Sequence, residues 1–121
     1  MANELTINLN AYIANGQYKE AFTKQIAVTQ NTLGAASGIH IVTTSEGNLS
    51  LGDVATGGYT ILQNLDDTNY ITFGLDDAGT MKACMKLEPG EFAMFRLKPS
   101  TNLRMLANVA SCKVYYWVLN D

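Results

Sequence analysis

Residues 57–84 read GGYTILQNLDDTNYITFGLDDAGTMKAC, and this stretch decides the fold class. Apolar and polar residues alternate over 59–64 and again over 70–75, which is the period of a strand with one buried face. Clusters of Asp, Asn and Gly follow each run, at 65–69 and at 76–79, and supply turn chemistry. The stretch therefore predicts consecutive antiparallel strands joined by tight corners.

The same stretch carries two adjacent-aspartate pairs, Asp66-Asp67 and Asp76-Asp77. Paired carboxylates occur in metal sites, but a calcium-binding loop needs oxygen ligands at alternate positions. The series that starts at Asp67 is interrupted by Ile71, so this template fails. Aspartate favours turns because its side chain bonds to nearby backbone amides. We expect both pairs to be corners at opposite ends of a sheet.

Outward from this stretch, alternating runs recur about every ten residues with turn clusters between them. Short strands at this spacing are typical of an all-β sandwich or barrel. We expect a single domain over 1–121, an antiparallel, jelly-roll-like β-sandwich of about nine to ten short strands, with 1–14 as an N-terminal strand or arm. The expected strands cover 5–13, 26–29, 39–44, 49–51, 59–64, 70–75, 81–87, 92–97, 103–107 and 113–119.

One segment, QYKEAFTKQIAVTQ, fits two structures. Tyr18, Phe22 and Ile26 have helical spacing, yet the same residues also share one face of a strand. Because β-branched residues gather in its second half, we expect a strand over 26–29 and at most a short helical turn before it. The small residues at 33–38 predict a loop.

The composition is typical of a folded protein whose surface is partly covered. Hydrophobic residues make up 47% of the chain and charged residues 16%, against about 25% charged in an average soluble protein. The formal net charge is -3 and the pI is about 5.0. The eight Lys and Arg are scattered, which argues against a nucleic-acid partner bound through phosphates. The low charge indicates that part of the surface is covered by something else, such as another copy of the chain.

The sequence gives no indication of secretion or membrane insertion. The first ten residues, MANELTINLN, contain no basic stretch followed by an apolar run. No apolar run approaches the roughly 18 residues of a membrane helix. We therefore expect no membrane partner, and synthesis in a cytoplasm.

Residues capable of catalysis are few, and none stands in a catalytic motif. His40 is the only histidine, and we expect it to face solvent or a neighbouring side chain. Cys84 and Cys112 lie outside any C-x-x-C motif, so we expect two reduced thiols on strands. The glycines form no phosphate-binding pattern. We predict no catalytic, cofactor-binding or metal-binding residue, and no enzyme.

The aromatic residues leave a binding function open. Tyr59, Tyr70, Tyr115, Tyr116 and Trp117 could line a platform for a sugar, because aromatic faces stack on apolar sugar faces. The other interpretation places one set of these rings in the core and the other at an outer face or a subunit contact.

The turns and strands of this chain also resemble those of a known group of proteins. The residues that carry the resemblance are Leu51-Gly52-Asp53-Val54, Gly58-Tyr59, Asn64-Leu65-Asp66 with Thr68-Asn69-Tyr70, Gly74, and Leu87 through Phe95-Arg96-Leu97. Over roughly 20–119, the pattern resembles a family of small structural proteins from tailed bacteriophages. It contains no catalytic signature.

This resemblance implies a non-enzymatic virion protein without cofactors, made in the cytoplasm of a bacterial host. Some small β-proteins of this kind are capsid decoration, or cement, proteins that stabilise the head from its surface. In that role the partners would be further copies of the chain, with a trimer favoured, and the phage major capsid protein. The resemblance also allows a tail or neck adaptor or a fibre-associated protein.

The N-terminal strand lies outside the resemblance. A strand that starts this close to the first residue must be tied down to stay ordered. Leu5, Ile7 and Leu9 are therefore our candidate interface with a capsid or a neighbouring copy. The alternative is an edge strand that packs on its own domain.

Overall fold

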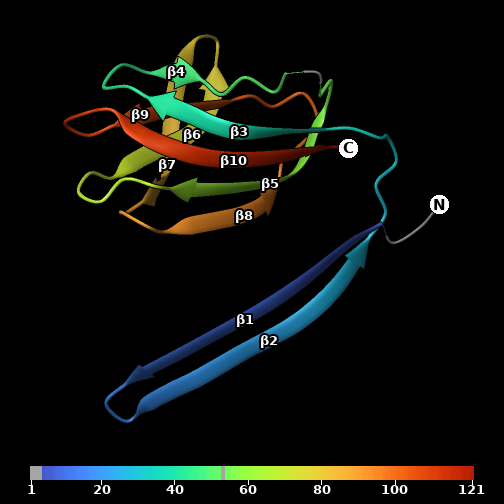
Figure 1. The fold of residues 1–121 in the computed structure, drawn as a ribbon, viewed down its shortest axis with the longest axis vertical. Coiled ribbons are helices and arrows are strands. Elements are labelled where there is room, and N and C mark those ends of the chain that lie inside the picture. Colours follow the sequence, from blue (N-terminus) through green and yellow to red (C-terminus); the bar gives the residue numbers. More distant parts are fainter. Residues whose placement is uncertain (1–3, 53) are drawn as a thin grey trace. The chain divides into compact units, whose positions relative to one another are not determined.

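The computed structural model describes residues 4–52 and 54–121, and all regular structure in these residues is β-strand. The chain divides into two compact units, Met1–Asn31 and Thr32–Asp121. All strand pairs are antiparallel, which confirms the all-β class. The strands shown in Figure 1 are β1 (Leu5–Asn15), β2 (Tyr18–Val28), β3 (Ala35–Val42), β4 (Gly47–Asn48), β5 (Gly57–Asn64), β6 (Ile71–Asp77), β7 (Thr80–Leu87), β8 (Phe92–Arg96), β9 (Leu103–Ala107) and β10 (Cys112–Asn120).

The first unit is a hairpin of β1 and β2. All eleven residues of β1 pair with a residue of β2, ending with Asn15 opposite Tyr18 at the corner. Gly16 in the corner has a φ of 61°, which glycine adopts without strain. At the open end of the hairpin, beyond the Leu5–Val28 pair, the Glu4 carboxylate accepts a hydrogen bond from the Gln30 amide, with an Oε2–N distance of 3.1 Å.

The hairpin corrects our expectation for the segment before residue 26. We expected at most a short helical turn there, but β2 is a strand over its whole length. Continuous pairing with β1 satisfies the backbone groups of β2, and a helical turn would interrupt that ladder. We also expected 1–14 to be an N-terminal strand or arm of the sandwich domain; β1 is a strand, and it pairs with β2 in a sheet of their own.

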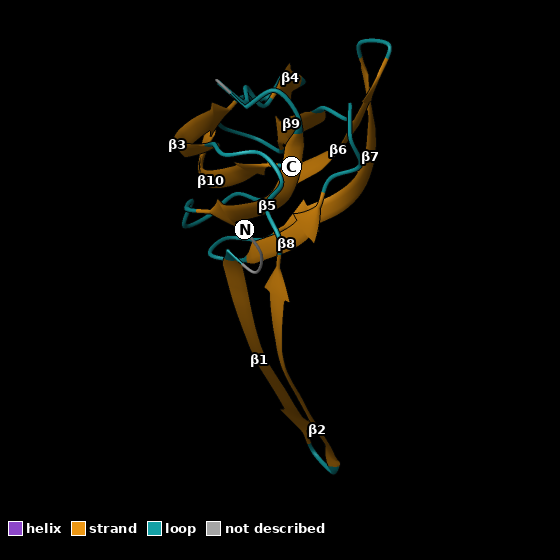
Figure 2. Ribbon diagram, turned by 90° about the vertical axis from the view of Figure 1, so that its right-hand side faces the viewer, coloured by secondary structure: helices purple, strands orange, loops and turns teal. Residues whose placement is uncertain are grey.

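The second unit is a β-sandwich of two four-stranded sheets, visible in Figure 2. One sheet has the order β3-β10-β5-β8 and the other β4-β9-β6-β7. Only β6 and β7 follow one another within a sheet, so every other connection crosses between the layers. The jelly-roll-like arrangement that we expected stays a prediction.

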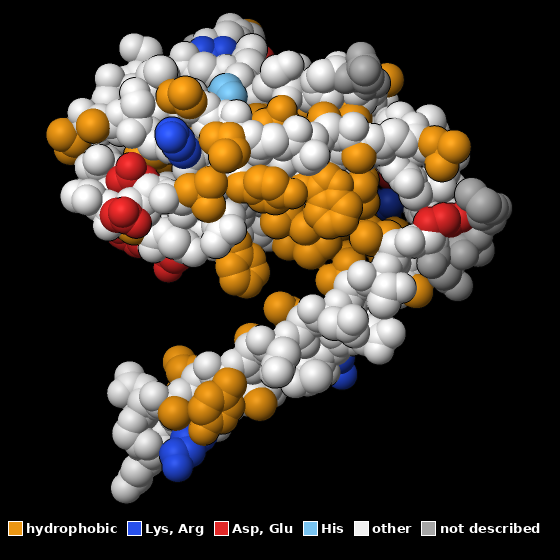
Figure 3. All heavy atoms as spheres, in the orientation of Figure 1, with side chains coloured by type: hydrophobic (Ala, Val, Ile, Leu, Met, Phe, Trp, Pro, Cys, Tyr) orange, Lys and Arg blue, Asp and Glu red, His pale blue; other side chains and the backbone are white. Residues whose placement is uncertain are grey.

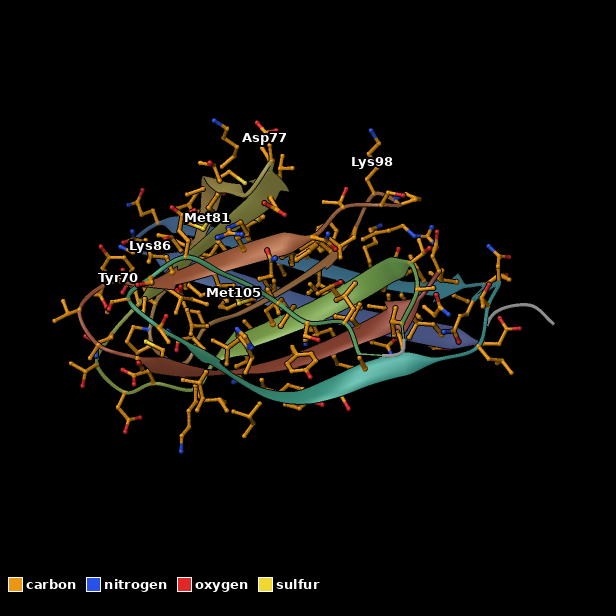
Figure 4. The ribbon with its side chains drawn as sticks, turned by 90° about the horizontal axis from the view of Figure 1, so that it is seen from above. Tyr70, Asp77, Met81, Lys86, Lys98 and Met105 are labelled. Carbon is orange, nitrogen blue, oxygen red and sulfur yellow. The ribbon has the colours of Figure 1, made fainter. Side chains whose placement is uncertain are left out.

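The core lies between the two sheets. The rings of Phe73 on β6 and Phe95 on β8 stack across the layers with centroids 6.0 Å apart. Met105 on β9 is 1% exposed and lies between the layers, while Asp77 and Lys98 project outward at corners (Figure 4). The buried apolar residues are Val42, Leu49, Val54, Leu62, Ile71, Phe73, Leu87, Leu97, Leu103, Met105, Ala107, Cys112, Val114 and Val118.

A buried asparagine joins the two layers. Asn64, at the end of β5, is fully buried. Its Nδ2 donates to the carbonyl oxygens of Asn69, at 2.9 Å, and of Leu87, at 3.1 Å. Its Oδ1 accepts from the amide of Asp66 at 3.0 Å. Because its donor and acceptor are both used, this polar side chain is tolerated inside an apolar core.

The aspartate pairs are corners, as the sequence predicts. The Asp66 carboxylate accepts from the amides of Thr68, at 3.0 Å, and Asn69, at 2.6 Å, before β6 begins. Asp76 accepts from the amide of Gly79 at 3.0 Å in the corner after β6. The two corners therefore lie at opposite ends of one strand.

Two boundaries in the sandwich differ from expectation. The expected loop at 33–38 is wrong, because β3 begins at Ala35, inside the small residues. Gly38 has a φ of 152°, which favours glycine, and a Cβ there would lie in ordinary contact with the Tyr116 ring on the neighbouring strand, 3.6 Å from its hydroxyl. The expected strand at 49–51 is replaced by β4, which is shorter and ends at Asn48, one residue before the expected strand begins.

Candidate functional site

The hairpin has one apolar face and one polar face, because its register aligns the odd positions of β1 with the even positions of β2. Among its apolar residues Phe22 is 51% exposed and Ile13 is 48% exposed. Figure 3 shows hydrophobic side chains along this ribbon. The hairpin apolar face consists of Leu5, Ile7, Leu9, Ala11, Ile13, Tyr18, Phe22, Ile26 and Val28, and Asn15, Glu20 and Lys24 share this side of the ribbon.

The opposite face of the hairpin is mainly polar. Asn10 and Thr23 are paired there, and their side chains are hydrogen-bonded at 3.2 Å. Asn8 lies opposite Gln25 on the same face. Tyr12 is its one large ring and is largely exposed. This contrast is the pattern of a strand pair that covers an apolar surface on one side only.

The three residues predicted as an interface lie together on the hairpin apolar face. Leu5 and Ile7 are half-buried and Leu9 is exposed. They lie on β1 at alternate positions, and Leu5 and Ile7 pair with Val28 and Ile26 of β2. The predicted interface did not include β2, which contributes four of the nine apolar residues of this surface.

A second apolar surface covers the outer side of the sheet β3-β10-β5-β8. Residues of this sheet alternate between the core and the outside, and the outward strand positions carry two charged residues, Arg96 and Lys113. Ile39 and Ile41 are each 58% exposed. Figure 3 shows hydrophobic side chains gathered over β10, β5 and β8. The sheet apolar face consists of Ile39, Ile41, Tyr59, Ile61, Phe92, Met94, Tyr115, Trp117 and Leu119.

The outer side of the other sheet is charged. The Arg104 guanidinium on β9 lies 3.6 Å from the Glu46 carboxylate and 3.7 Å from that of Asp76. On β7, Lys86 pairs with Glu88 at 2.6 Å and lies over the Tyr70 ring, 4.1 Å from its centroid (Figure 4). A solvated outer sheet is typically polar in this way. The apolar outer face is therefore specific to one of the two layers.

The candidate sugar platform is divided in the structure. Tyr59, Tyr115 and Trp117 share the sheet apolar face, but Tyr116 on the opposite side of β10 packs against the core. Tyr70 leads into β6 in the other sheet, where Lys86 covers its ring. Arg96 also covers one face of Tyr59, at 5.0 Å from the ring centroid. Two of the five rings are thus outside any common platform.

The remaining titratable residues are dispersed. His40 points to the inner side of β3 and is half-buried, and this burial lowers its pKa. Cys84 on β7 is exposed and Cys112 on β10 is buried; both are free thiols on strands. Burial, and then the charge of Asp66, raise the pKa of Cys112. Within 4–52 and 54–121, no group of three or more His, Cys, Asp or Glu is placed to hold a metal ion.

An open groove of about 540 Å³ lies between β7 and β8. Its apolar lining includes Phe73, Met85 and Phe92, and its polar lining Lys86 and Glu91. Phe92 belongs to the sheet apolar face as well, so groove and face are continuous. The lining carries no cluster that could perform a reaction.

One sequence signal could have revealed the sheet apolar face. Along β10 both the inward and the outward residues are apolar or aromatic from Val114 to Leu119. A strand buried on one side alternates with polar residues, whereas a strand covered on both sides is an unbroken apolar run. IHIV at 39–42 shows the same feature apart from its histidine. Both strands are therefore typical of a sheet with a second covered face.

The part of the chain described by the structure contains no helix that is long and apolar enough to cross a membrane. Comparisons with protein-family models, curated proteins and solved structures find no match for this chain.

Proposed function

We propose that this chain is a non-enzymatic structural protein of a tailed-phage virion. In this proposal it decorates the capsid surface as a homo-oligomer, with three copies favoured, and binds the major capsid protein. It is made in the cytoplasm of the bacterial host and uses no cofactor, nucleic acid or membrane.

The observation that carries the proposal is the exposed hairpin apolar face. A ribbon of two strands is marginally stable alone, so a ribbon with one apolar side is suited to packing on a protein surface. The sandwich supplies a stiff body of two packed sheets. The resemblance over 20–119 supplies the virion context. A protein that reinforces a shell needs these properties and no reactive group.

The test is the location of the chain in purified particles. Virions of the phage whose genome encodes it are separated into DNA-filled heads and free tails by using tail-assembly mutants, and each fraction is analysed by quantitative mass spectrometry. We expect the chain on heads, in copy numbers that follow the capsid lattice. Heads assembled without it should keep their shape and release DNA at a lower temperature.

Two results would contradict the decoration role. The chain in tails alone, as a ring of six or twelve copies, would identify a neck or tail adaptor instead. The chain in neither fraction would remove the virion assignment altogether.

A carbohydrate-binding module is the second candidate, because Tyr59, Tyr115 and Trp117 share one exposed face. Retention of the protein on a glycan array, lost in Trp117→Ala and kept in Tyr70→Ala, would support it. Tyr70 is the matched control because its ring is covered by Lys86 on the other sheet.

A further inference from the structure

We infer that the hairpin apolar face of one copy docks on the sheet apolar face of a second copy. The inference rests on the self-association within the proposed function and does not depend on the phage assignment. The two surfaces bind each other, so one kind of contact between copies covers both.

Both surfaces carry large apolar side chains of the kind that are usually buried. The hairpin presents Phe22 and Ile26 to solvent, and the sheet presents Ile39, Ile41 and Phe92. Contiguous apolar patches of this kind on a small protein mark interaction sites. A pairing of two hairpins alone would cover only the first surface and leave the sheet exposed. Docking of a hairpin on a sheet covers both.

The dimensions of the two surfaces match. β1 and β2 have eleven residues each, so the ribbon is about 36 Å long and roughly 10 Å wide. β10, in the middle of the sheet, has nine residues, or about 30 Å. One docked ribbon covers roughly 350 Å² on each partner. Two reciprocal contacts then bury on the order of 1,400 Å², which is within the range of stable specific interfaces.

The connection between hairpin and sandwich favours a neighbouring copy over the chain's own sheet. On the hairpin side, the amide of Gln30 is bound by Glu4. On the sandwich side, Asn120 donates from Nδ2 to the Leu33 carbonyl at 3.1 Å and from its amide to the Gly34 carbonyl at 2.9 Å. Only residues 31 and 32 lie between these two anchors.

This short connection limits where the hairpin can dock. The three Cα steps from Gln30 to Leu33 span at most about 11 Å. Stacked sheets are about 10 Å apart, so nearly the full length is needed to reach the next layer above β3, the edge strand. Little length remains for the sideways shift to the middle of the sheet. A connection this short disfavours docking on the chain's own sheet and leaves that sheet to another molecule, and exchange of identical arms closes into a symmetric oligomer.

The test compares full-length variants by size-exclusion chromatography with light scattering. Phe22→Lys places a charge on the hairpin apolar face, and Ile39→Lys places one on the sheet apolar face. Tyr12→Lys is the matched control, since Tyr12 lies on the opposite face of the hairpin and is more exposed than Phe22. Circular dichroism checks that each variant is folded, which we expect because all three side chains are exposed.

We expect the wild type and Tyr12→Lys to be oligomers with a mass of at least twice 13.2 kDa. Phe22→Lys and Ile39→Lys should each weaken association at least tenfold and elute as monomers at micromolar concentration. An equimolar mixture of these two variants should recover part of the oligomer, because an intact hairpin on one chain meets an intact sheet on the other.

Different failures have different meanings. If Phe22→Lys is monomeric but Ile39→Lys keeps the full mass, hairpins pair with one another and this inference is overturned while self-association stands. An oligomer that neither variant weakens would also overturn the inference alone. A wild type that is monomeric at all concentrations would overturn both this inference and the homo-oligomer in the proposed function, whereas the virion fractions test the phage assignment separately.

Discussion

At the scale of single residues, Asn64 is the polar group on which the core depends most. It satisfies the Asn69 and Leu87 carbonyls and the Asp66 amide from a fully buried position. Asn64→Ala leaves these three backbone groups without their partner and opens a small cavity. We expect the free energy of unfolding to fall by about 2 to 3 kcal/mol.

Urea denaturation followed by tryptophan fluorescence measures this loss. Asn108→Ala is the control, because Asn108 is exposed and its side chain takes no part in the core. If Asn64→Ala lowers the free energy of unfolding no more than Asn108→Ala does, the role that we assign to Asn64 is contradicted.

Asp66 should make stability depend on pH. Hydrogen bonds from the amides of Asn69 and Thr68 lower its pKa below the usual value of 3.8. A carboxyl group whose pKa is lower in the folded state stabilises the fold above its unfolded pKa, and this contribution disappears as the pH falls through the folded value. We therefore expect part of the unfolding free energy to be lost as the pH falls below about 4.

The measurement is urea denaturation at pH 7, 4 and 2.5 for the wild type and Asp66→Asn. The variant should be less sensitive to the change from pH 4 to 2.5, because its side chain no longer ionises. Asp67→Asn is the adjacent control and should retain the wild-type dependence. If the free energy of unfolding falls equally with pH in all three proteins, the hydrogen bonds to the Asp66 carboxylate do not contribute to acid sensitivity.

At the scale of elements, the β6–β7 pair requires a glycine. The register shifts between Phe73 and Gly74, where a bulge brings the two strands close together. A Cβ on Gly74 would overlap the Lys82 carbonyl oxygen and lie 2.8 Å from the Cα of Ala83. These are backbone atoms, so the clash cannot be relieved by turning a side chain.

We expect Gly74→Ala to destabilise the protein by on the order of 3 kcal/mol or more, since the ladder must shift. Thermal unfolding measures the effect. Gly47→Ala in β4 is the matched control because no heavy atom lies within 4 Å of its added Cβ. If both substitutions lower the stability by the same amount, the close approach of the strands at Gly74 does not account for the requirement for glycine.

The stability of the β1–β2 hairpin depends on a surface outside the hairpin. Its eleven pairs satisfy the backbone, but its exposed apolar side gains no burial from pairing alone. Isolated two-stranded hairpins are marginally stable for this reason. The stability of β1 and β2 thus depends on whatever covers the hairpin apolar face.

At the scale of the whole molecule, self-association should couple folding to protein concentration. Binding to the folded state alone raises the midpoint of thermal unfolding as the concentration of the partner rises. For a closed pair of 121-residue chains, a tenfold increase in concentration should raise Tm by about 2 to 3 °C.

Differential scanning fluorimetry between 1 and 100 μM is sufficient to detect such a shift. The Tm of Phe22→Lys should not change over the same range. A wild-type Tm that is independent of concentration would argue against an oligomer linked to folding.

Local chemistry is what the sequence by itself determined. Alternation over 59–64 and 70–75 predicted strands, and the aspartates at 66 and 76 predicted the corners between them, because both depend on residues adjacent in the chain. The boundaries of β9 were predicted to the residue, and those of β5, β6, β7, β8 and β10 to within two. The candidate interface residues Leu5, Ile7 and Leu9 were placed on one face of a strand, and the structure shows them at alternate positions of β1.

The pairing of distant strands was decided only by the tertiary structure. β10 lies between β3 and β5, and this pairing converts the small residues before Ile39 from an expected loop into a strand. The register of β1 on β2 selects a strand over a helical turn around Phe22 and creates a continuous apolar face. Such pairings join residues far apart in the chain, so their energy depends on packing between elements and leaves little trace in any local pattern.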